Sequence, residues 1–197
     1  MKIGIFGDSR VAGVGHLPSG YEGISELMRF QSNHTYVKFA TPSSGIQYMQ
    51  TLWNALSSED QLSFDYLISE IGHNNFVADG GSSSVILGRI QSFINDLYAK
   101  KKSSCKIVVN QITPMLGSIE TWTEDTEQRA IYLNCWSEIN AGLSSLDYID
   151  SICTEHISIM DDGTGKMKSI YINGTDLTHP NRVGKDIIAD CDLKLVI

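Results

Sequence analysis

The sequence predicts an α/β protein with a parallel sheet that carries helices on both faces. Short apolar runs alternate along the chain with stretches of helical periodicity, which is the order of repeated strand–helix units. The composition is globular, with 42% hydrophobic and 19% charged residues in a chain of 197. No internal repeat, linker or low-complexity segment divides the chain, so we expect one domain over residues 1–197.

The expected strands are short apolar runs bounded by turn residues. Residues 2–6 form the first, and residues 105–112 are rich in β-branched side chains. Residues 156–160 and 168–172 flank an Asp162-Gly163 turn, which predicts a hairpin. The other expected strands are residues 35–39, which alternate, and residues 64–72, which end at a glycine.

Apolar residues between these strands recur every three or four positions, which predicts amphipathic helices. Such a helix is expected over residues 83–101, with a serine of the segment 80–85 as its N-cap. A long helix is expected over residues 125–145, and its buried side is predicted to consist of Ile131, Cys135, Ile139 and Leu143. The remaining expected helices are residues 20–31, 46–57 and 181–193.

The charge distribution disfavours a nucleic-acid partner. The net charge is -8, and the only basic run, residues 100–102, falls at the end of an expected helix. No stretch approaches the roughly 18 apolar residues of a membrane span. The first ten residues, MKIGIFGDSR, are not apolar enough for a signal peptide. We therefore expect a cytoplasmic protein, and its release from the cell or its presence in a phage particle stays open.

The sequence predicts neither a metal site nor a cofactor site. The four cysteines, Cys105, Cys135, Cys153 and Cys191, are far apart and lack histidines at ligand spacing. We expect each to be a small buried apolar residue, and their even number permits disulfides without requiring them. The glycine patterns of dinucleotide sites, of P-loops and of the GxSxG elbow are absent or incomplete.

Small polar clusters follow the expected strands. In open α/β sheets, binding sites form beyond the carboxyl ends of the strands. Four clusters fall at such ends or in the loops after them: Gly7-Asp8-Ser9-Arg10, Ser43-Ser44-Gly45, Gly72-His73-Asn74-Asn75 and Asp176-Leu177-Thr178-His179. The pattern therefore predicts one site built from residues that are distant in sequence.

These clusters hold the groups that a serine nucleophile needs, which are a base, a group that orients the base, and donors for the oxyanion. Ser9 follows the first strand, and Asp176 precedes His179 by three residues, a spacing that lets the carboxylate bond one ring nitrogen. The N–H groups of Ser9 and Gly45 and the amide of Asn74 are candidate oxyanion donors. Each residue alone also fits a turn, a cap or a helix start, but the five in this order favour a site.

The ordered blocks GDSR, SSGIQ, GHNN and DLTHPN resemble those of the SGNH (GDSL-type) hydrolase family, from residue 3 to about residue 190. The resemblance implies a flavodoxin-like three-layer α/β/α sandwich and ester hydrolysis without metal or cofactor. It also implies that Ser9 is the nucleophile, His179 the general base and Asp176 the residue that orients it. Ser9, Gly45 and Asn74 would form the oxyanion hole.

Two positions depart from the family pattern. Arg10 replaces a leucine, and it faces either the substrate pocket or the helix layer; in the first case it would favour an acidic sugar. Asn75 replaces an aspartate that is mainly structural, which puts the geometry of its loop in doubt. His73 lies outside the pattern, and we expect a solvated loop residue there, with substrate contact as the alternative.

A short acyl group, above all acetyl on a glycan, is the substrate that the sequence favours, because a long apolar lid segment is missing. Three loop aromatics, Tyr21, Phe76 and Trp122, could stack on sugar faces. The alternatives are a lipid esterase of the lysophospholipase or thioesterase type, and a catalytically inactive carbohydrate-binding module on the same fold. The expected partner is thus a small-molecule or glycan ester, and the sequence predicts no oligomeric state.

Overall fold

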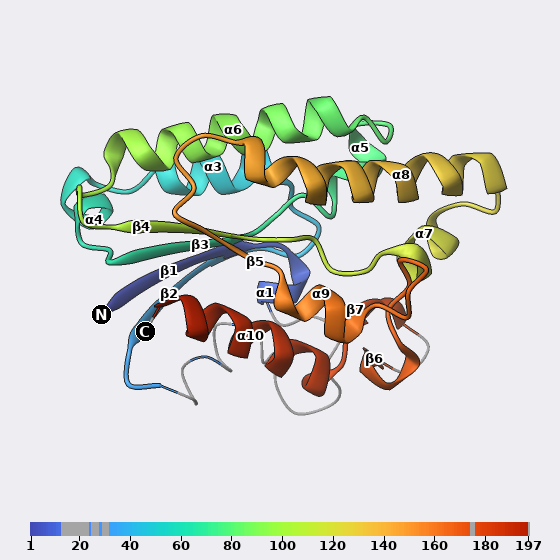
Figure 1. Cartoon of the computed structure of the whole chain (residues 1–197). Helices are drawn as coiled ribbons and strands as arrows, with labels where there is room; N and C mark the ends of the chain where they lie inside the picture. Colours follow the sequence, from blue (N-terminus) through green and yellow to red (C-terminus); the bar gives the residue numbers. More distant parts are fainter. Residues whose placement is uncertain (13–23, 25–27, 29–31, 174–175, 197) are drawn as a thin grey trace.

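The central feature of the computed structural model is a parallel sheet (Figure 1). The structure describes residues 1–12, 24, 28, 32–173 and 176–196. Its five strands lie in the order β2-β1-β3-β4-β5. This order reverses direction between β1 and β3, which is the switch point of a flavodoxin-like sheet. The strands are β1 (Lys2–Gly7), β2 (Thr35–Ala40), β3 (Tyr66–Glu70), β4 (Lys106–Asn110) and β5 (Ser151–Cys153).

Helices cover both faces of this sheet, as predicted (Figure 1). On one face lie α3 (Ile46–Asn54), α6 (Ser83–Lys100) and α8 (Thr126–Gly142), and on the other lie α9 (Glu155–Met160) and α10 (Arg182–Val196). Alternate side chains of the strands enter two separate apolar cores: Phe6 packs with the first set of helices, whereas Ile3 and Ile5 pack with α10. The three-layer α/β/α class is therefore confirmed.

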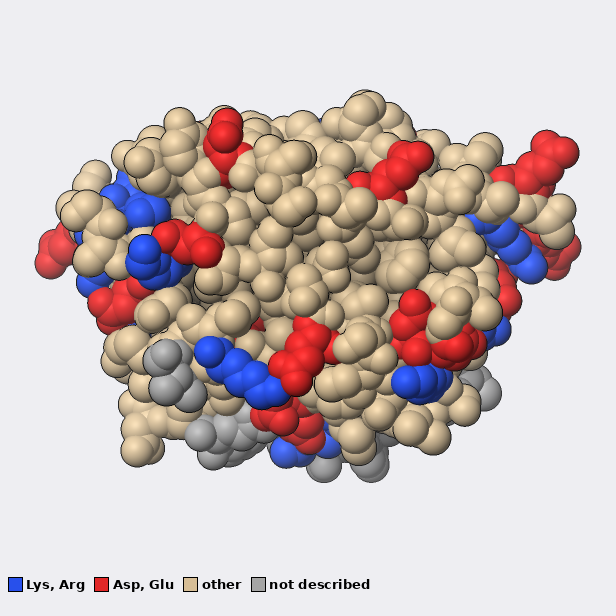
Figure 2. Space-filling model, in the orientation of Figure 1, with Lys and Arg blue, Asp and Glu red and all other residues tan. Residues whose placement is uncertain are grey.

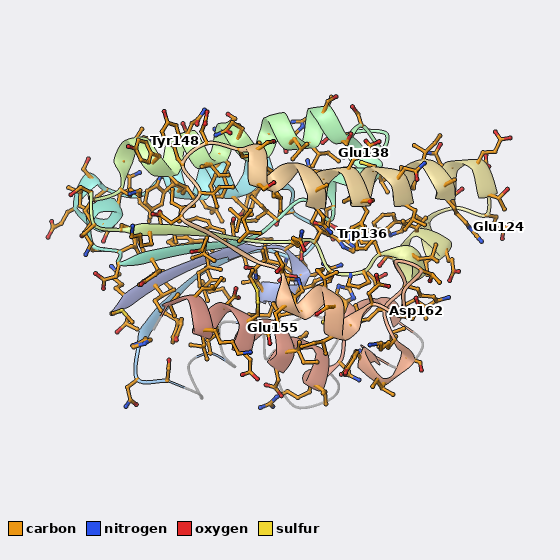
Figure 3. The ribbon with its side chains drawn as sticks, viewed as in Figure 1. Glu124, Trp136, Glu138, Tyr148, Glu155 and Asp162 are labelled. Carbon is orange, nitrogen blue, oxygen red and sulfur yellow. A yellow bond between two sulfur atoms is a disulfide. The ribbon has the colours of Figure 1, made fainter. Side chains whose placement is uncertain are left out.

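Short elements surround the carboxyl ends of the strands. They are α1 (Ser9–Ala12), α5 (Asn75–Ala78) and α7 (Leu116–Trp122), which follow β1, β3 and β4. The short helix α4 (Ser58–Leu62) instead precedes β3 and lies at the amino ends of the strands (Figure 1). The 3-10 turns are η1 (Leu143–Ser145) and η2 (Ser169–Tyr171), and β6 (Ile172–Asn173) and β7 (Asp176–Pro180) pair as an antiparallel ribbon outside the main sheet. Trp136 projects from α8 toward the strand ends (Figure 3) and donates from Nε1 to the Ile112 carbonyl at 2.7 Å.

The predicted hairpin of residues 156–160 and 168–172 is wrong. The first segment is the helix α9, the second runs through η2 into β6, and the only pairing between their neighbourhoods in the described chain is the isolated bridge of Asp161 with Met167. His156 and Met160 are fully buried, and their separation of four positions is the spacing of one helix face. A short apolar run such as residues 156–160 fits either a strand or a helix, and burial of this face favours the helix.

Three smaller expectations need correction or fall outside the description. Ile131 is 48% exposed, and Tyr132 takes its place on the buried side of α8 beside Cys135, Ile139 and Leu143. Ser82 occupies the N-cap position of α6, but its side chain accepts no capping hydrogen bond. Of the helix expected over residues 20–31, only positions 24 and 28 lie within the described residues, and both are buried.

The cysteines divide into two pairs. Cys105 and Cys135 are buried free thiols, as expected. Cys153 and Cys191 instead form a disulfide, which joins β5 to α10 across 38 residues of sequence. This second pair is buried as expected, and it forms one of the disulfides that the even number of cysteines permits, because the fold brings two distant elements together.

Charged side chains of both signs are intermingled on the face shown in Figure 2, mainly around its margins. Within the residues that the structure describes, no helix has the length and apolar character needed to cross a membrane.

Candidate active site

A tight turn at the end of β1 places Ser9. A Cβ at Gly7 would lie 2.3 Å from a methyl carbon of Val11, so only glycine allows α1 to start this close to the strand. Asp8 is buried, and its Oδ1 accepts the backbone N–H of Arg10 at 3.1 Å. The turn thus leaves Ser9 as the first residue of α1, at the carboxyl edge of the sheet.

The structure brings Ser9 together with His179, 170 residues further along the chain. The Ser9 Oγ atom lies 2.7 Å from Nε2 of His179, and both side chains are half-buried. A hydroxyl that donates to an unprotonated imidazole nitrogen at this distance is positioned to lose its proton to that ring. This pair is therefore the candidate nucleophile and base of the site.

The elements that flank His179 hold it in place. His179 lies in β7, which pairs with β6, and α10 starts at Arg182. Asn181 caps that helix, because its Oδ1 accepts the Gly184 N–H at 3.0 Å while its Nδ2 donates to the Ile170 carbonyl at 2.8 Å. Pro180 ends β7 rather than starting α10, so the cap and not the proline sets the start of the helix.

Asp176 is the first residue of β7 and pairs with Asn173. Its side chain lies outside the described structure, so its role in orienting His179 stays a prediction.

The second and third polar clusters, residues 43–45 and 72–75, meet next to β1, the strand that precedes Ser9. Asn74 donates from Nδ2 to the Ser44 carbonyl at 2.9 Å, and among the described residues its second amide hydrogen has no acceptor. Gly45 is the N-cap of α3, and its backbone N–H makes no hydrogen bond to any described residue. A Cβ at Gly45 would lie 2.9 Å from Oδ1 of Asn75, so the close approach of these two blocks requires glycine. Two of the three predicted oxyanion donors, Gly45 and Asn74, therefore keep an N–H that no described residue accepts.

Asn75 performs a structural task in place of the expected aspartate. Its Oδ1 accepts the N–H of Ile46 at 3.0 Å, which fixes the start of α3, and its Nδ2 donates to Oδ2 of Asp79 at 3.0 Å. Asp79 is also paired with Arg89 at 2.6 Å. An aspartate could accept the first bond but could not donate the second. The doubt about the loop geometry is thus resolved by the amide.

Arg10 faces inward, beneath the site. Its side chain is 2% exposed, and its Nη1 lies 3.6 Å from Oε1 of Glu70 at the end of β3. Its Nη2 contacts the ring nitrogen Nδ1 of His73, which is 3% exposed. The expectation of a solvated His73 is therefore wrong, and so is an Arg10 that faces the substrate.

These contacts set the protonation of the two partners of Arg10. A guanidinium only donates, so Nδ1 of His73 accepts and the ring is neutral. Burial, followed by the charges of Arg10 and His179, lowers the pKa of His73 well below its usual value. Burial raises the pKa of Glu70 to about 7, although the charge of Arg10 acts in the opposite direction.

Glu70 is the site neighbour that sequence reasoning missed, because it lies inside the apolar run 64–72. The signal is a carboxylate at the carboxyl end of a strand whose last four residues are all buried. Two further charged residues, Lys185 and Asp192 on α10, are fully buried on the same side of the molecule and interact electrostatically with Glu70.

A serine hydrogen-bonded to a histidine at the switch point of a flavodoxin-like sheet is the arrangement expected of a serine hydrolase of the α/β type. Comparison with family models agrees. The model of the GDSL-like lipase/acylhydrolase family matches residues 3–191, and the chain belongs to this family. It is therefore an enzyme that hydrolyses ester bonds.

Solved structures of similar fold cover nearly the whole chain. A lipolytic G-D-S-L family protein from Veillonella parvula has a TM-score of 0.70 at 17% identity, with 98% of this chain and 97% of that one covered. The lipase Lip_vut3 from a goat rumen metagenome has a TM-score of 0.74 at 12% identity (98% and 96% covered). The esterase EstA from Pseudoalteromonas has a TM-score of 0.62 at 14% identity (99% and 98% covered). A comparison with curated protein sequences finds no match. At these identities the likenesses show the fold alone.

Proposed function

We propose that this enzyme removes short acyl groups, above all acetyl, from a glycan through an acyl-enzyme on Ser9. The observation that carries the mechanism is the 2.7 Å separation of Ser9 Oγ and His179 Nε2. As Oγ attacks the carbonyl carbon, Nε2 takes its proton, and the resulting imidazolium returns that proton to the leaving alcohol. Water then attacks the acyl-enzyme with the same ring as base. We assign to Asp176 the role of orienting the imidazole ring of His179.

The developing oxyanion is assigned to three donors. They are the backbone N–H groups of Ser9 and Gly45 and the second amide hydrogen of Asn74. Pre-aligned donors of this kind stabilise charge that forms only in the transition state, which is why they raise the rate.

Trp122 supports a sugar as the alcohol. Its ring is half-buried and stands edge-on to His73, with 5.2 Å between ring centres, so it lies next to the Asn74 loop. An aromatic face at the rim of a site is suited to the apolar face of a sugar ring. Phe76 is fully buried and cannot take this role, and Tyr21 lies outside the described residues. Burial of Arg10 removes the reason to favour an acidic sugar.

One observation favours the lipid-esterase alternative. Tyr48, Val77 and Val183 are 44%, 53% and 54% exposed. They follow Gly45, Asn74 and His179 by three or four residues, in the helices that begin at the site. Apolar side chains in these positions could contact an acyl chain or a lipid surface. The inactive-module alternative is disfavoured by the intact Ser9–His179 contact.

Chromogenic esters test the mechanism and the acyl chain length together. We expect the wild type to hydrolyse p-nitrophenyl acetate faster than the butyrate or palmitate ester. Ser9→Ala and His179→Ala should each lower kcat by a factor of ~10⁴ to 10⁶. His34→Ala, a histidine just before β2 at the opposite end of the sheet, should leave kcat unchanged. Fastest turnover of palmitate would favour the lipid esterase, and unchanged activity in Ser9→Ala would refute the mechanism.

Trp122→Ala tests the glycan. The variant should raise the KM for an acetylated oligosaccharide about tenfold, which corresponds to the 1–1.5 kcal/mol of one aromatic contact, while kcat/KM for p-nitrophenyl acetate stays constant. Release of acetate is the readout for the oligosaccharide. Equal KM values in both enzymes would contradict the sugar-stacking role, and loss of both activities would instead indicate a damaged site.

A further inference from the structure

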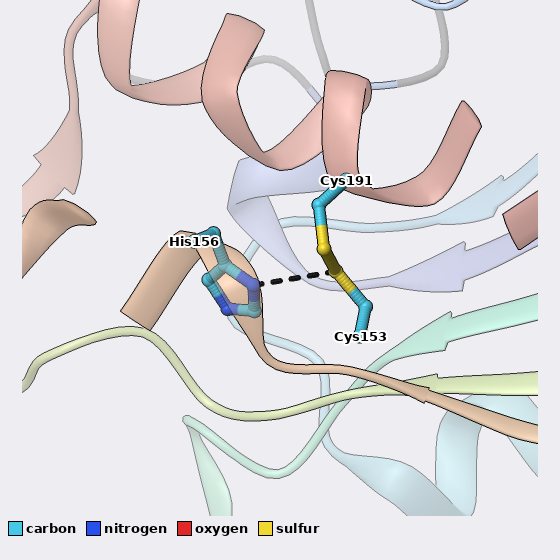
Figure 4. A group of neighbouring side chains, drawn as sticks. All are labelled: Cys153, His156 and Cys191. Carbon is cyan, nitrogen blue, oxygen red and sulfur yellow. Dashed lines mark hydrogen bonds between the residues drawn. A yellow bond between two sulfur atoms is a disulfide. The ribbon is translucent and has the colours of Figure 1, made fainter. Parts of the chain in front are cut away.

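A second cluster of reactive side chains lies apart from Ser9, between β5, α9 and α10. Cys153 ends β5, His156 lies in the first turn of α9 and Cys191 lies in α10 (Figure 4). The Nδ1 atom of His156 and the two sulfur atoms all lie within 4.8 Å of one another. The side chains are buried, with exposed fractions of 1%, 0% and 5%. Two sulfur atoms and one imidazole nitrogen from three elements thus converge on one point. The expectation that no histidine lies at ligand spacing from a cysteine is therefore wrong for Cys153 and His156.

The orientation of His156 is fixed by the backbone. Its Nε2 donates to the carbonyl oxygen of Gln111 at 2.9 Å, so the other nitrogen, Nδ1, carries the lone pair. Nδ1 lies 3.4 Å from Sγ of Cys153 (dashed line in Figure 4). A histidine that ligates a metal commonly donates its second N–H to a backbone carbonyl in this way.

In the disulfide form, Nδ1 of His156 has no donor. A disulfide sulfur carries no hydrogen, and no other described residue donates to this nitrogen. A buried acceptor without a partner costs about 1–3 kcal/mol, so an imidazole is an unexpected neighbour for a purely structural disulfide. The lone pair is satisfied once the sulfurs are reduced, either by a thiol S–H or by a cation held between the three atoms.

We propose that the reduced form of this cluster is a binding site for one thiophilic divalent cation, with Zn²⁺ as the preferred ion. A dithiol or phosphine reductant supplies two electrons, and two protons convert the disulfide to two thiols. Each thiol then releases its proton when its sulfur binds the ion. Zn–S bonds of about 2.3 Å and Zn–N bonds of about 2.0 Å place a tetrahedral S and N about 3.5 Å apart. The present 3.4 Å separation of Cys153 Sγ and His156 Nδ1 fits that geometry. The fourth position is left to water.

Cobalt(II) is the probe, because its visible absorption is intense when it is bound tetrahedrally by thiolates. The whole protein is reduced with a phosphine, desalted without oxygen and titrated with Co²⁺. We expect one Co²⁺ per chain, a thiolate-to-cobalt absorption band, and displacement by Zn²⁺. The same protein kept oxidised should bind no cobalt at the site. Absence of the band in the reduced wild type would overturn the proposal.

Single substitutions assign the ligands. Cys191→Ser and His156→Gln should each weaken Co²⁺ binding by more than the ~10–100-fold that loss of an outer-shell partner costs. Cys135→Ser removes a buried free thiol of α8 and should bind cobalt like the wild type. Wild-type affinity in Cys191→Ser, or loss of the band in Cys135→Ser alone, would contradict the assignment. If the ligand variants do not fold, the reduced and oxidised wild type still decide the question.

Discussion

The two amide hydrogens of Asn74 have different roles, one structural and one assigned to catalysis. One bonds the Ser44 carbonyl at 2.9 Å, and the other is assigned to the oxyanion. Asn74→Ala should therefore lower kcat for p-nitrophenyl acetate by a factor of ~10² to 10³ with little change in KM, as for loss of one oxyanion donor. Asn54→Ala, which removes an exposed amide of α3, is the matched control. A rise in KM without loss of kcat would show that Asn74 binds the ground state instead.

Glu70 should make the stability of this protein depend on pH in a recognisable way. Its pKa is about 7 in the folded state, against 4.5 for the ordinary carboxyl group. Between these values the folded chain binds more protons than the unfolded chain, so the free energy of unfolding falls as pH rises. From pH 6 to pH 8 the loss from this group is about 1 kcal/mol.

Urea unfolding at both pH values measures this effect. His73 and His156 act in the opposite direction. Burial lowers their pKa values, so their contribution to the free energy of unfolding rises with pH. The Glu70 contribution is therefore the difference between the wild type and Glu70→Gln, in which the carboxyl is absent. Glu59→Gln, on the exposed α4, serves as control. An identical pH dependence in Glu70→Gln would rule out the raised pKa.

At the scale of elements, Asn75 and Asp79 join the start of α3 to α5. Asn75→Asp would keep the acceptor for Ile46 but would place a carboxylate 3.0 Å from Oδ2 of Asp79. The substitution should lower the free energy of unfolding by about 1–3 kcal/mol, because a buried hydrogen bond becomes a repulsion. Adding Asp79→Asn restores a donor and should recover most of the loss in urea unfolding. Additive losses in the double variant would show that the two residues are not coupled.

The long elements of this fold follow from their periodicity, whereas the short ones depend on tertiary contacts. Residues 83–101 step by three and four between apolar positions, and α6 covers 83–100. Residues 156–160 hold too few positions to distinguish a strand from a helix, and burial of His156 and Met160 against the sheet decides. The strand β5 has only three residues, and pairing with β4 defines it.

The candidate site also combines residues that the sequence pattern identifies with contacts that only the fold creates. Ser9 and His179 could be named because their residue types and positions are characteristic of one chemistry, and the fold brings them within 2.7 Å. The contact of Arg10 with Glu70 and His73 could not be foreseen. Arg10 is polar and lies beside a nucleophile, so its sequence position suits a substrate contact equally well. Its burial depends on the carboxylate of Glu70, which is two strands away in sequence. No local sequence pattern predicts a contact between these two residues.

At the scale of the whole molecule, the disulfide ties the chain's final helix to the edge of the sheet. It closes a segment of 38 residues that includes α9, the β6–β7 ribbon and His179. In the chain-entropy model, closing a loop of this length in the unfolded state is worth about 4 kcal/mol. No pattern in the sequence specifies this pairing, because four cysteines allow several connectivities.

Removal of this bond should therefore destabilise the entire domain rather than one element. Cys153→Ser with Cys191→Ser should lower the free energy of unfolding by up to about 4 kcal/mol in urea, measured with a chelator present so that no cation compensates. A reductant should reduce the stability of the wild type toward that of the double variant and leave the double variant unchanged. Because His179 lies within the closed segment, kcat for p-nitrophenyl acetate should fall in parallel as urea approaches the midpoint of unfolding. Reductant sensitivity in the double variant would instead point to Cys105 or Cys135, the two remaining thiols.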